Sequence, residues 1–357
     1  MTGTVSSFGF GGLSGQMLLG LQTLTKSQSS LQGQTSTGVT ADSYAGLGSA
    51  RTQALALQPA ITRISSWSGN VTAAQNKLTS TQTALSQISD IASDLTSTLG
   101  VLSSTSSIST QSVVTASAQA KNALSTLTGL LNTQQGDTYV FAGQQSSVAP
   151  VSENLEGSDL YTQVENAVSQ LGTKDASAVL SQATTCAANT KPDSPFSASL
   201  STDPVSAANE NQKIVMGQNE TVSVGLVATQ GEAASALSTG SPVRDLVRNL
   251  MMVASLGTTD TGSRDYTDII QDLQTSTQNV TSSLADMSGV MGVQQDSLTT
   301  HSSLLSQMSS ALTTQLGNTK DADLAQVSTQ FTDTNNQLQA SYSIIADMKS
   351  MTLASYL

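Results

Sequence analysis

The side chains that most often do chemistry are scarce in this chain. It holds one histidine, His301, and one cysteine, Cys186, among 357 residues. A nucleophilic triad or a multi-ligand zinc site needs several such groups together. Asp90 and Asp94 have helical spacing on a solvent-type face, where charge is ordinary. No Gly-rich phosphate loop follows a predicted strand, and Gly9–Gly12 is better interpreted as a flexible lead-in. The sequence therefore predicts no catalytic residue, no cofactor and no metal site.

The single histidine and the single cysteine both fit structural roles. His301 falls on an apolar helical seam beside Gln294, which is typical of a partly buried polar residue that fixes register. A pH sensor is the other interpretation of His301. Cys186 lies in Thr184–Ala188 without a nearby histidine, so we interpret it as structural or incidental.

The composition favours thin helical bundles over a thick core. Charged residues make up 11% of the chain, where about 25% is typical, and aromatic residues only 3%. Hydroxyl and amide side chains are easier to desolvate than charges. A surface rich in Ser, Thr and Gln can therefore pack repeatedly against copies of itself, although a genome-level bias toward small polar residues would give the same composition.

The net charge of −12 argues against nucleic acid and against an anionic membrane surface as partners. No stretch approaches the roughly 20 apolar residues that span a bilayer, so no membrane insertion is expected. Residues Met1–Ser7 lack a basic segment followed by an apolar run, and we expect no ordinary secretory signal.

Apolar residues recur every seven positions from Leu57 to Leu99, and each of the first six is followed by a companion three residues later. This spacing predicts a coiled-coil helix about 65 Å long, in which Thr81 is the only polar seam member. The predicted seam residues are Leu57, Ile64, Trp67, Val71, Leu78, Leu85, Leu95 and Leu99.

A second heptad series runs from Tyr266 to Leu312 and predicts a helix about 70 Å long. The two long helices are natural antiparallel partners, since their lengths match and a central insert separates them. The seam residues of the second helix are Ile270, Leu284, Met291, Leu298, Leu305 and Leu312.

The middle of the chain is less regular. A further helix is predicted over residues 109–133, and a short β-like run follows between Gly136 and Gly143. Alternating apolar residues around a Gly/Asn turn predict a hairpin over Lys213–Val227. Leu160–Leu180 has weak helical character, and we interpret residues 136–242 as a mixed or β-rich module.

Both ends of the chain carry only thin apolar stripes. Ordering the backbone costs about 1–2 kcal/mol per residue, so we expect the ends to be poorly ordered in a free monomer and to fold on partners. The second stripe follows a predicted break at Gly317–Asn318. The stripe residues are Met17, Leu21, Leu24 and Leu31 near the start, and Leu324, Phe331, Leu338, Tyr342, Ile345, Leu353 and Leu357 near the end.

The predicted fold is mostly α: a long antiparallel coiled-coil bundle formed by the N- and C-terminal regions, with a central β-containing insert. Its predicted domains are an N-terminal assembly helix and linker (1–45), the first half of the long-helix bundle (46–135), the central outer domain (136–242), the second half of the bundle (243–317) and a C-terminal assembly helix (318–357).

Several segments resemble bacterial flagellins and their junction proteins. Leu31–Ser43 is similar to a Leu…Ser-Ser/Thr-Gly segment of that family without its basic position, and Tyr44–Leu47 is similar to its Ala-Gly-Leu run without the preceding acidic pair. Ser288–Gln294 resembles the Val-Gly-Ala-Arg turn of the returning helix without the arginine. The end of the chain, Gln337–Leu357, resembles the Leu-Gln-Ala-Ser tail that closes in Leu-Leu-x-Tyr-Leu.

One segment favours a junction subunit over a divergent filament flagellin. Tyr139, Phe141 and Gly143 resemble the Tyr-x-Phe-Ala/Ser-Gly run of hook–filament junction proteins, and the Ile-Asn-Thr-Asn opening usual in filament subunits is absent. The resemblance implies type III export, an export chaperone on the C-terminal helix, and assembly outside the cell with copies of itself, flagellin and hook-associated proteins.

Two other classes share part of this pattern. A coiled-coil signalling protein, such as a chemoreceptor cytoplasmic domain, also has heptads rich in Ala, Ser and Gln, but it predicts a membrane anchor or an unbroken hairpin. A secreted adhesin or translocator with coiled-coil arms is the third interpretation, and polymerisation of the monomer would separate it from the flagellar one.

Overall fold

The computed structural model describes residues 8–104, 109–151, 154–190, 194–258 and 264–350. The chain forms two compact units. Unit 1 comprises Met1–Ser65 with Gln307–Leu357, and unit 2 comprises Ser66–Ser306. The division falls inside the two longest helices, α2 (Arg51–Ser104) and α8 (Arg264–Lys320).

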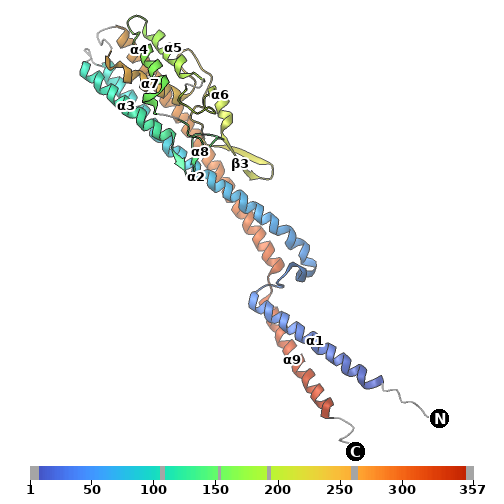
Figure 1. Cartoon of the computed structure of the whole chain (residues 1–357). Helices are drawn as coiled ribbons and strands as arrows, with labels where there is room; N and C mark the ends of the chain where they lie inside the picture. The colour runs from blue at the N-terminus through green and yellow to red at the C-terminus, as the bar shows by residue number, and fades with distance from the viewer. Residues whose placement is uncertain (1–7, 105–108, 152–153, 191–193, 259–263, 351–357) are drawn as a thin grey trace, which may run out of the picture. The chain divides into compact units, whose positions relative to one another are not determined.

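In unit 1, α1 (Phe8–Thr37) and α9 (Leu324–Ser350) lie side by side (Figure 1). The chain leaves α1 at Gly38, whose φ of +73° favours glycine. Beyond it, the backbone N–H of Thr40 donates to the carbonyl of Lys320 at 2.7 Å, and that of Ala322 donates to Gly38 at 2.9 Å. These bonds fix an antiparallel pair, because they join the end of α1 to the start of α9. A short 3₁₀ helix, η1 (Tyr44–Ala50), leads into α2.

In unit 2, α2 and α8 run antiparallel, as the two heptad series predict. The Gln75 amide donates to the Thr299 hydroxyl at 3.4 Å, and Gly100 faces the Gln274 amide. Both contacts keep one register, since 25 residues separate them on each helix. The mostly α fold and the long helix pair are confirmed.

One predicted helix end is wrong. Helix α8 continues through Gly317 and Asn318 and ends at Lys320. Asn318 is accommodated inside the last turn, where the Asp321 N–H donates to the Gly317 carbonyl at 2.7 Å and extends the helical bonding pattern.

The insert is more helical than predicted. The helix before it, α3 (Thr110–Leu131), follows Ser109, whose hydroxyl accepts from the Ser112 N–H at 3.1 Å and caps the helix. Between residues 136 and 242 the described helices are α4 (Asp159–Val168), α5 (Ala176–Ala187), α6 (Pro204–Ala207) and the 3₁₀ turns η2 (Leu155–Gly157) and η3 (Ala208–Glu210). Of the two interpretations of this module, the described residues fit the mixed one and not the β-rich one, because Ser158 and Asp203 cap helices there and Asp175 occupies the N-cap position of α5.

Within the described ranges, two small antiparallel hairpins form the named strands. One joins β1 (Gln134–Gln135) to β2 (Thr138–Tyr139). The other joins β3 (Gln212–Gly217) to β4 (Glu220–Val224), with Gln212 opposite Val224 and an irregularity between Val215 and Gly217. This second hairpin confirms the Gly/Asn turn prediction, and its Asn219 has a φ of +68°.

Helix α7 (Pro242–Ser255) begins where the predicted insert ends and is followed by η4 (Leu256–Thr258). All fourteen residues of α7 are buried. It packs on α3, α4 and α5 (Figure 1), so this helix organises a core that these helices share.

Candidate functional site

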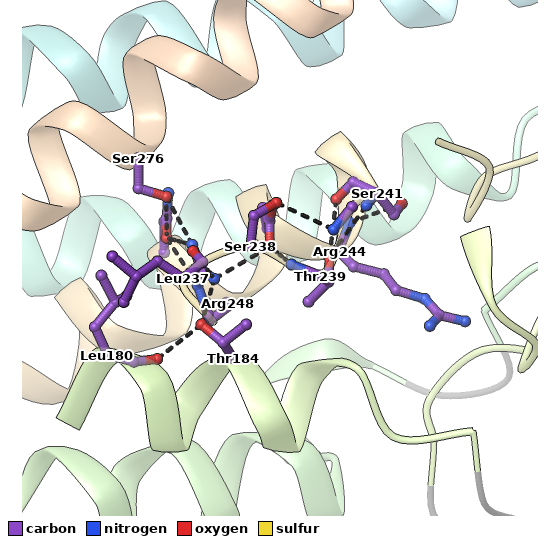
Figure 2. A network of polar contacts seen from close by, with 12 residues as sticks. Leu180, Thr184, Leu237, Ser238, Thr239, Ser241, Arg244, Arg248 and Ser276 are labelled. Carbon is purple, nitrogen blue, oxygen red and sulfur yellow. Dashed lines mark hydrogen bonds and ion pairs between the residues drawn. The ribbon is translucent and has the colours of Figure 1, made fainter. Parts of the chain in front are cut away.

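The charged groups of unit 2 that are most deeply buried lie on α7. Asp245 follows the Ser241 N-cap by four residues, and its carboxylate accepts from the Thr239 N–H at 2.8 Å and from the Ser238 hydroxyl at 2.5 Å. An Arg248 guanidinium nitrogen lies 3.1 Å from the same carboxylate. Figure 2 shows Arg248 between Thr184 of α5 and Ser276 of α8.

Every guanidinium nitrogen of Arg248 has a partner. Nη1 also donates to the Thr184 hydroxyl of α5 at 2.6 Å and to the Leu237 carbonyl at 3.0 Å, and Nη2 donates to the Ser276 hydroxyl of α8 at 2.6 Å. Nε and Nη2 both reach the Asn249 side-chain carbonyl. Burial lowers the pKa of Arg248, and the nearby Asp245 charge opposes that change. The network thus links three helices through one saturated cation.

Arg244, one turn earlier on α7, points away from this network (Figure 2). Its Nη2 donates to the carbonyls of Leu200 and Thr202 at 2.7 and 2.9 Å, and its guanidinium lies 5.6 Å from the centre of the Phe196 ring. Burial lowers the pKa of Arg244 to about 10, and Asp203 and Asp245 oppose that change. Arg244 therefore anchors the loop before α6.

The α7 network is suited to holding helices together rather than to catalysis. Both Asp245 oxygens accept hydrogen bonds, so no free base remains there. A pocket of about 240 Å³ beside it is lined by Asp245, Asp272 and several hydroxyl side chains. Burial, with Asp268 nearby, raises the pKa of Asp272. Within the described ranges, no three His, Cys, Asp or Glu side chains are grouped to hold a metal ion.

Sequence reasoning missed this network. Its signal was present, because Arg244 and Arg248 stand one helical turn apart in a helix whose other residues are largely apolar. Burial of Arg248 depends on hydroxyl groups of α5 and α8, and burial of Arg244 depends on carbonyl groups of the loop before α6; all of these are distant in sequence.

The predicted seam residues lie on α2 and α8, and most of them are buried. Trp67 and Leu312 are half-buried. The buried members are Leu57, Ile64, Val71, Leu78, Leu85, Leu95 and Leu99 on α2, and Ile270, Leu284, Met291, Leu298 and Leu305 on α8.

The predicted stripe residues of the terminal helices are far less covered. Only Leu31 on α1 and Leu338 on α9 are buried, whereas Leu324 and Tyr342 are exposed. Leu353 and Leu357 lie outside the described residues. The half-buried members are Met17, Leu21, Leu24, Phe331 and Ile345.

The α1–α9 pair exposes further apolar side chains that the stripe prediction did not include. Leu18 and Leu19 are 59% and 65% exposed, and Ile344 is 48% exposed. A groove of about 450 Å³ between the two helices is lined mainly by Gln, Thr and Ser, with Phe331 as its one large apolar side chain. The pair is also joined by the Gln28 amide and the Asn335 carbonyl at 2.5 Å. Apolar side chains of both helices thus stay exposed to solvent, and this surface is a candidate for binding other chains.

Residues 13–146 match the model of the bacterial flagellin N-terminal helical region. The match supports the bacterial flagellin family. It covers most of α1 and all of α2, α3 and the β1–β2 hairpin. No curated protein matches the chain in a sequence comparison. None of the described helices is long and apolar enough to cross a membrane.

The region that matches the flagellin model ends just beyond Gly143, which closes the junction-like segment. The Phe141 side chain is buried, and its carbonyl accepts from the Ala228 N–H at 3.0 Å. Tyr139, half-buried, donates its N–H to the Ser146 carbonyl at 2.8 Å. Gly143 has a φ of +64°, and a Cβ there would collide with the Glu210 carbonyl, so only glycine fits.

The two chemically distinctive residues have local roles. His301 Nε2 lies 3.2 Å from the Glu220 carboxylate at the β3–β4 turn, so α8 contacts the hairpin through it. Gln294 lies seven residues before His301 on α8, and its side-chain oxygen accepts a hydrogen bond from the Gly225 N–H at 3.1 Å. Cys186 is half-buried on α5, and burial raises the pKa of its thiol.

Proposed function

We propose that this protein is a structural subunit of the bacterial flagellum that assembles through its terminal helices. The main support is that the α1–α9 pair exposes apolar residues from both helices. In addition, residues 13–146 match the flagellin N-terminal region. Burying apolar surface is the main driving force of association. Leu18, Leu19 and Tyr342 lose most of their contact with water only if another chain covers them.

The proposed subunit type is the hook–filament junction protein. The support is the segment Tyr139, Phe141 and Gly143, whose spacing resembles that of junction proteins and whose glycine the fold requires. A divergent filament flagellin is the alternative, since the matched N-terminal region is described for flagellins in general.

Partners and location follow from this proposal. The partners are copies of the same chain, flagellin and hook-associated proteins, and the assembled protein lies outside the cell as part of the flagellum. An export chaperone would bind α9, whose exposed Leu324, Tyr342 and Ile344 need cover before assembly.

Two measurements test the proposal. Purified protein should form sedimentable polymer in concentrated salt, and a stable monomer with folded terminal helices would contradict a flagellar role and favour a signalling protein or an adhesin. Antibody labelling of flagella then separates the subunit types: label confined to the hook end supports the junction protein, and label along the whole length indicates a filament flagellin.

A further inference from the structure

A groove of about 690 Å³ lies in unit 2 between α2, the β1–β2 turn and the β3–β4 hairpin. The small side chains of Ala73 and Ala74 on α2 line part of its wall. The Asn70 amide crosses from α2 to the Val215 carbonyl at 2.9 Å and joins the hairpin to the helix. The remaining lining residues are Asn76, Lys77, Gln135, Gly136, Thr138, Gln212, Lys213, Ile214 and Val224.

Lys77 is the unusual member of this groove. Only 8% of the residue is exposed, and its ammonium donates to the neutral Gln212 carbonyl oxygen at 2.7 Å. Among the described residues, no carboxylate lies within 4 Å of it. Burial lowers the pKa of Lys77, because nothing negative offsets the lost hydration. A buried cation of this kind is costly unless it is paired.

The groove concentrates positive charge in an acidic protein. Lys213, the residue after Gln212, lines the same groove and is exposed. No aspartate or glutamate lines it, and Asp137 of the β1–β2 turn makes no ion pair with either lysine. Two of only 13 Lys and Arg therefore share one site in a chain of net charge −12. The chemistry that fits is a pair of carboxylates.

The same chain carries a matching pair of carboxylates. Asp90 and Asp94 are exposed on α2, one helical turn or about 6 Å apart. Neither forms an ion pair among the described residues, and like charges at this spacing disfavour a helix slightly. Inside one chain, this pair and the groove are separated by 13 to 17 residues along a straight helix, about 20–26 Å. They can meet only between two chains.

We propose that the groove of one subunit binds the Asp90 and Asp94 carboxylates of a second copy, with Lys77 and Lys213 as the paired cations. The contact is head-to-tail, because the two surfaces lie at different places on the chain, and such contacts build open polymers. It rests on the proposed function and deepens it, since it names a contact outside the terminal helices. Pairing in the polymer would satisfy the charge that is buried without a carboxylate in the single chain.

A charge exchange between exposed residues tests the contact without disturbing the core. Lys213→Glu and Asp94→Lys should each raise the critical concentration for polymerisation at least about tenfold. The double variant should restore most of the loss, since the pair is re-formed with its signs exchanged. Lys174→Glu is the matched control, because Lys174 is an exposed lysine like Lys213 but lies outside the groove, where its ammonium donates to the Gln182 side chain at 2.7 Å.

Lys77→Met separates binding from folding. Removing an unpaired buried charge should raise the melting temperature of the monomer, whereas the critical concentration should rise. Equal polymerisation of wild type, Lys77→Met and Lys213→Glu would overturn the contact and leave the proposed function standing. A wild-type protein that forms no polymer would overturn both.

Carbodiimide cross-linking of polymer made from mixed ¹⁴N- and ¹⁵N-labelled subunits identifies the bound carboxylates. The expected result is an isotopically mixed peptide that joins Lys213 or Lys77 to Asp90 or Asp94. Mixed cross-links that join these lysines to other acidic residues, or that exclude both lysines, would contradict the assignment.

Discussion

Among the side chains described on α1, which are those of residues 15–37, only Leu31 is buried, whereas every residue of α7 is buried. The groove between α1 and α9 is lined mainly by Gln, Ser and Thr side chains, and the Gln28 amide joins the pair through Asn335. The α7 core joins large apolar side chains to an arginine and an aspartate whose polar atoms are paired within the chain. The first region therefore keeps its unsatisfied surface for other chains, whereas the Asp245–Arg248 network of the second is satisfied within the monomer.

This difference separates the free energy of folding of the single chain from the free energy of association between chains. Substitutions in the α2–α8 seam or around α7 should lower the stability of the single chain. Substitutions on α1 and α9 should leave the stability of unit 2 unchanged and weaken association instead. Each variant below is chosen to break or sharpen that separation.

The largest expected effect on folding is at the seam. Leu78 is fully buried on α2, so Leu78→Asp places a carboxylate in the helix interface without a partner. We expect the free energy of unfolding to fall by more than about 4 kcal/mol, measured by urea denaturation with circular dichroism. Thr79→Asp, at the exposed neighbouring position, is the control. An unchanged melting temperature for Leu78→Asp would show that this seam is not the core.

Asp245→Ala should be nearly as damaging. It leaves the Arg248 guanidinium buried without its counter-charge, a loss of about 3–5 kcal/mol. The control is Glu156→Ala, which removes the solvent-exposed Lys121–Glu156 pair and should cost less than about 1 kcal/mol. If both variants unfolded at the same urea concentration, the α7 network would contribute nothing beyond a surface ion pair.

Ionisation of Tyr266 should lower the stability of the core at alkaline pH. Burial raises its pKa from 10 to about 12, so the unfolded chain loses the phenol proton first as the pH rises. Its contribution to stability is present below pH 10 and is lost between about pH 10 and 12. Tyr266→Phe should remove that part of the alkaline decline, at most about 2.7 kcal/mol. Tyr342→Phe, at an exposed position, should keep the wild-type profile in urea unfolding at pH 9 and 11.5.

The smallest expected effect on folding is on α9. Leu338→Ala removes one of the few buried side chains of the terminal pair, yet the unfolding of unit 2 should change by less than about 0.5 kcal/mol. Its critical concentration for polymerisation should rise clearly, since α9 supplies assembly surface. A large drop in the stability of unit 2 would contradict the division into two roles.

The regular parts of this fold were predictable because their signal is local and repeated. Heptads from Leu57 and from Tyr266 indicated α2 and α8, and the Gly/Asn turn indicated the β3–β4 hairpin. The insert was harder, since capping at Ser158 and Asp203 begins short helices that no long apolar period announces. The burial of Arg248 was out of reach, because it requires Thr184 and Ser276 from distant segments. For the assembly helices, spacing located Leu31 and Leu338 but missed the exposed Leu18 and Leu19.

The most direct test of the account is a truncation that separates assembly from folding. A chain that ends at Asp321 lacks α9 and should form no sedimentable polymer in concentrated salt, where the full chain does. Its urea unfolding, followed by circular dichroism, should keep the midpoint of unit 2. Normal polymerisation of the truncated chain, or loss of the cooperative unfolding of unit 2, would contradict the assignment of assembly to the terminal pair.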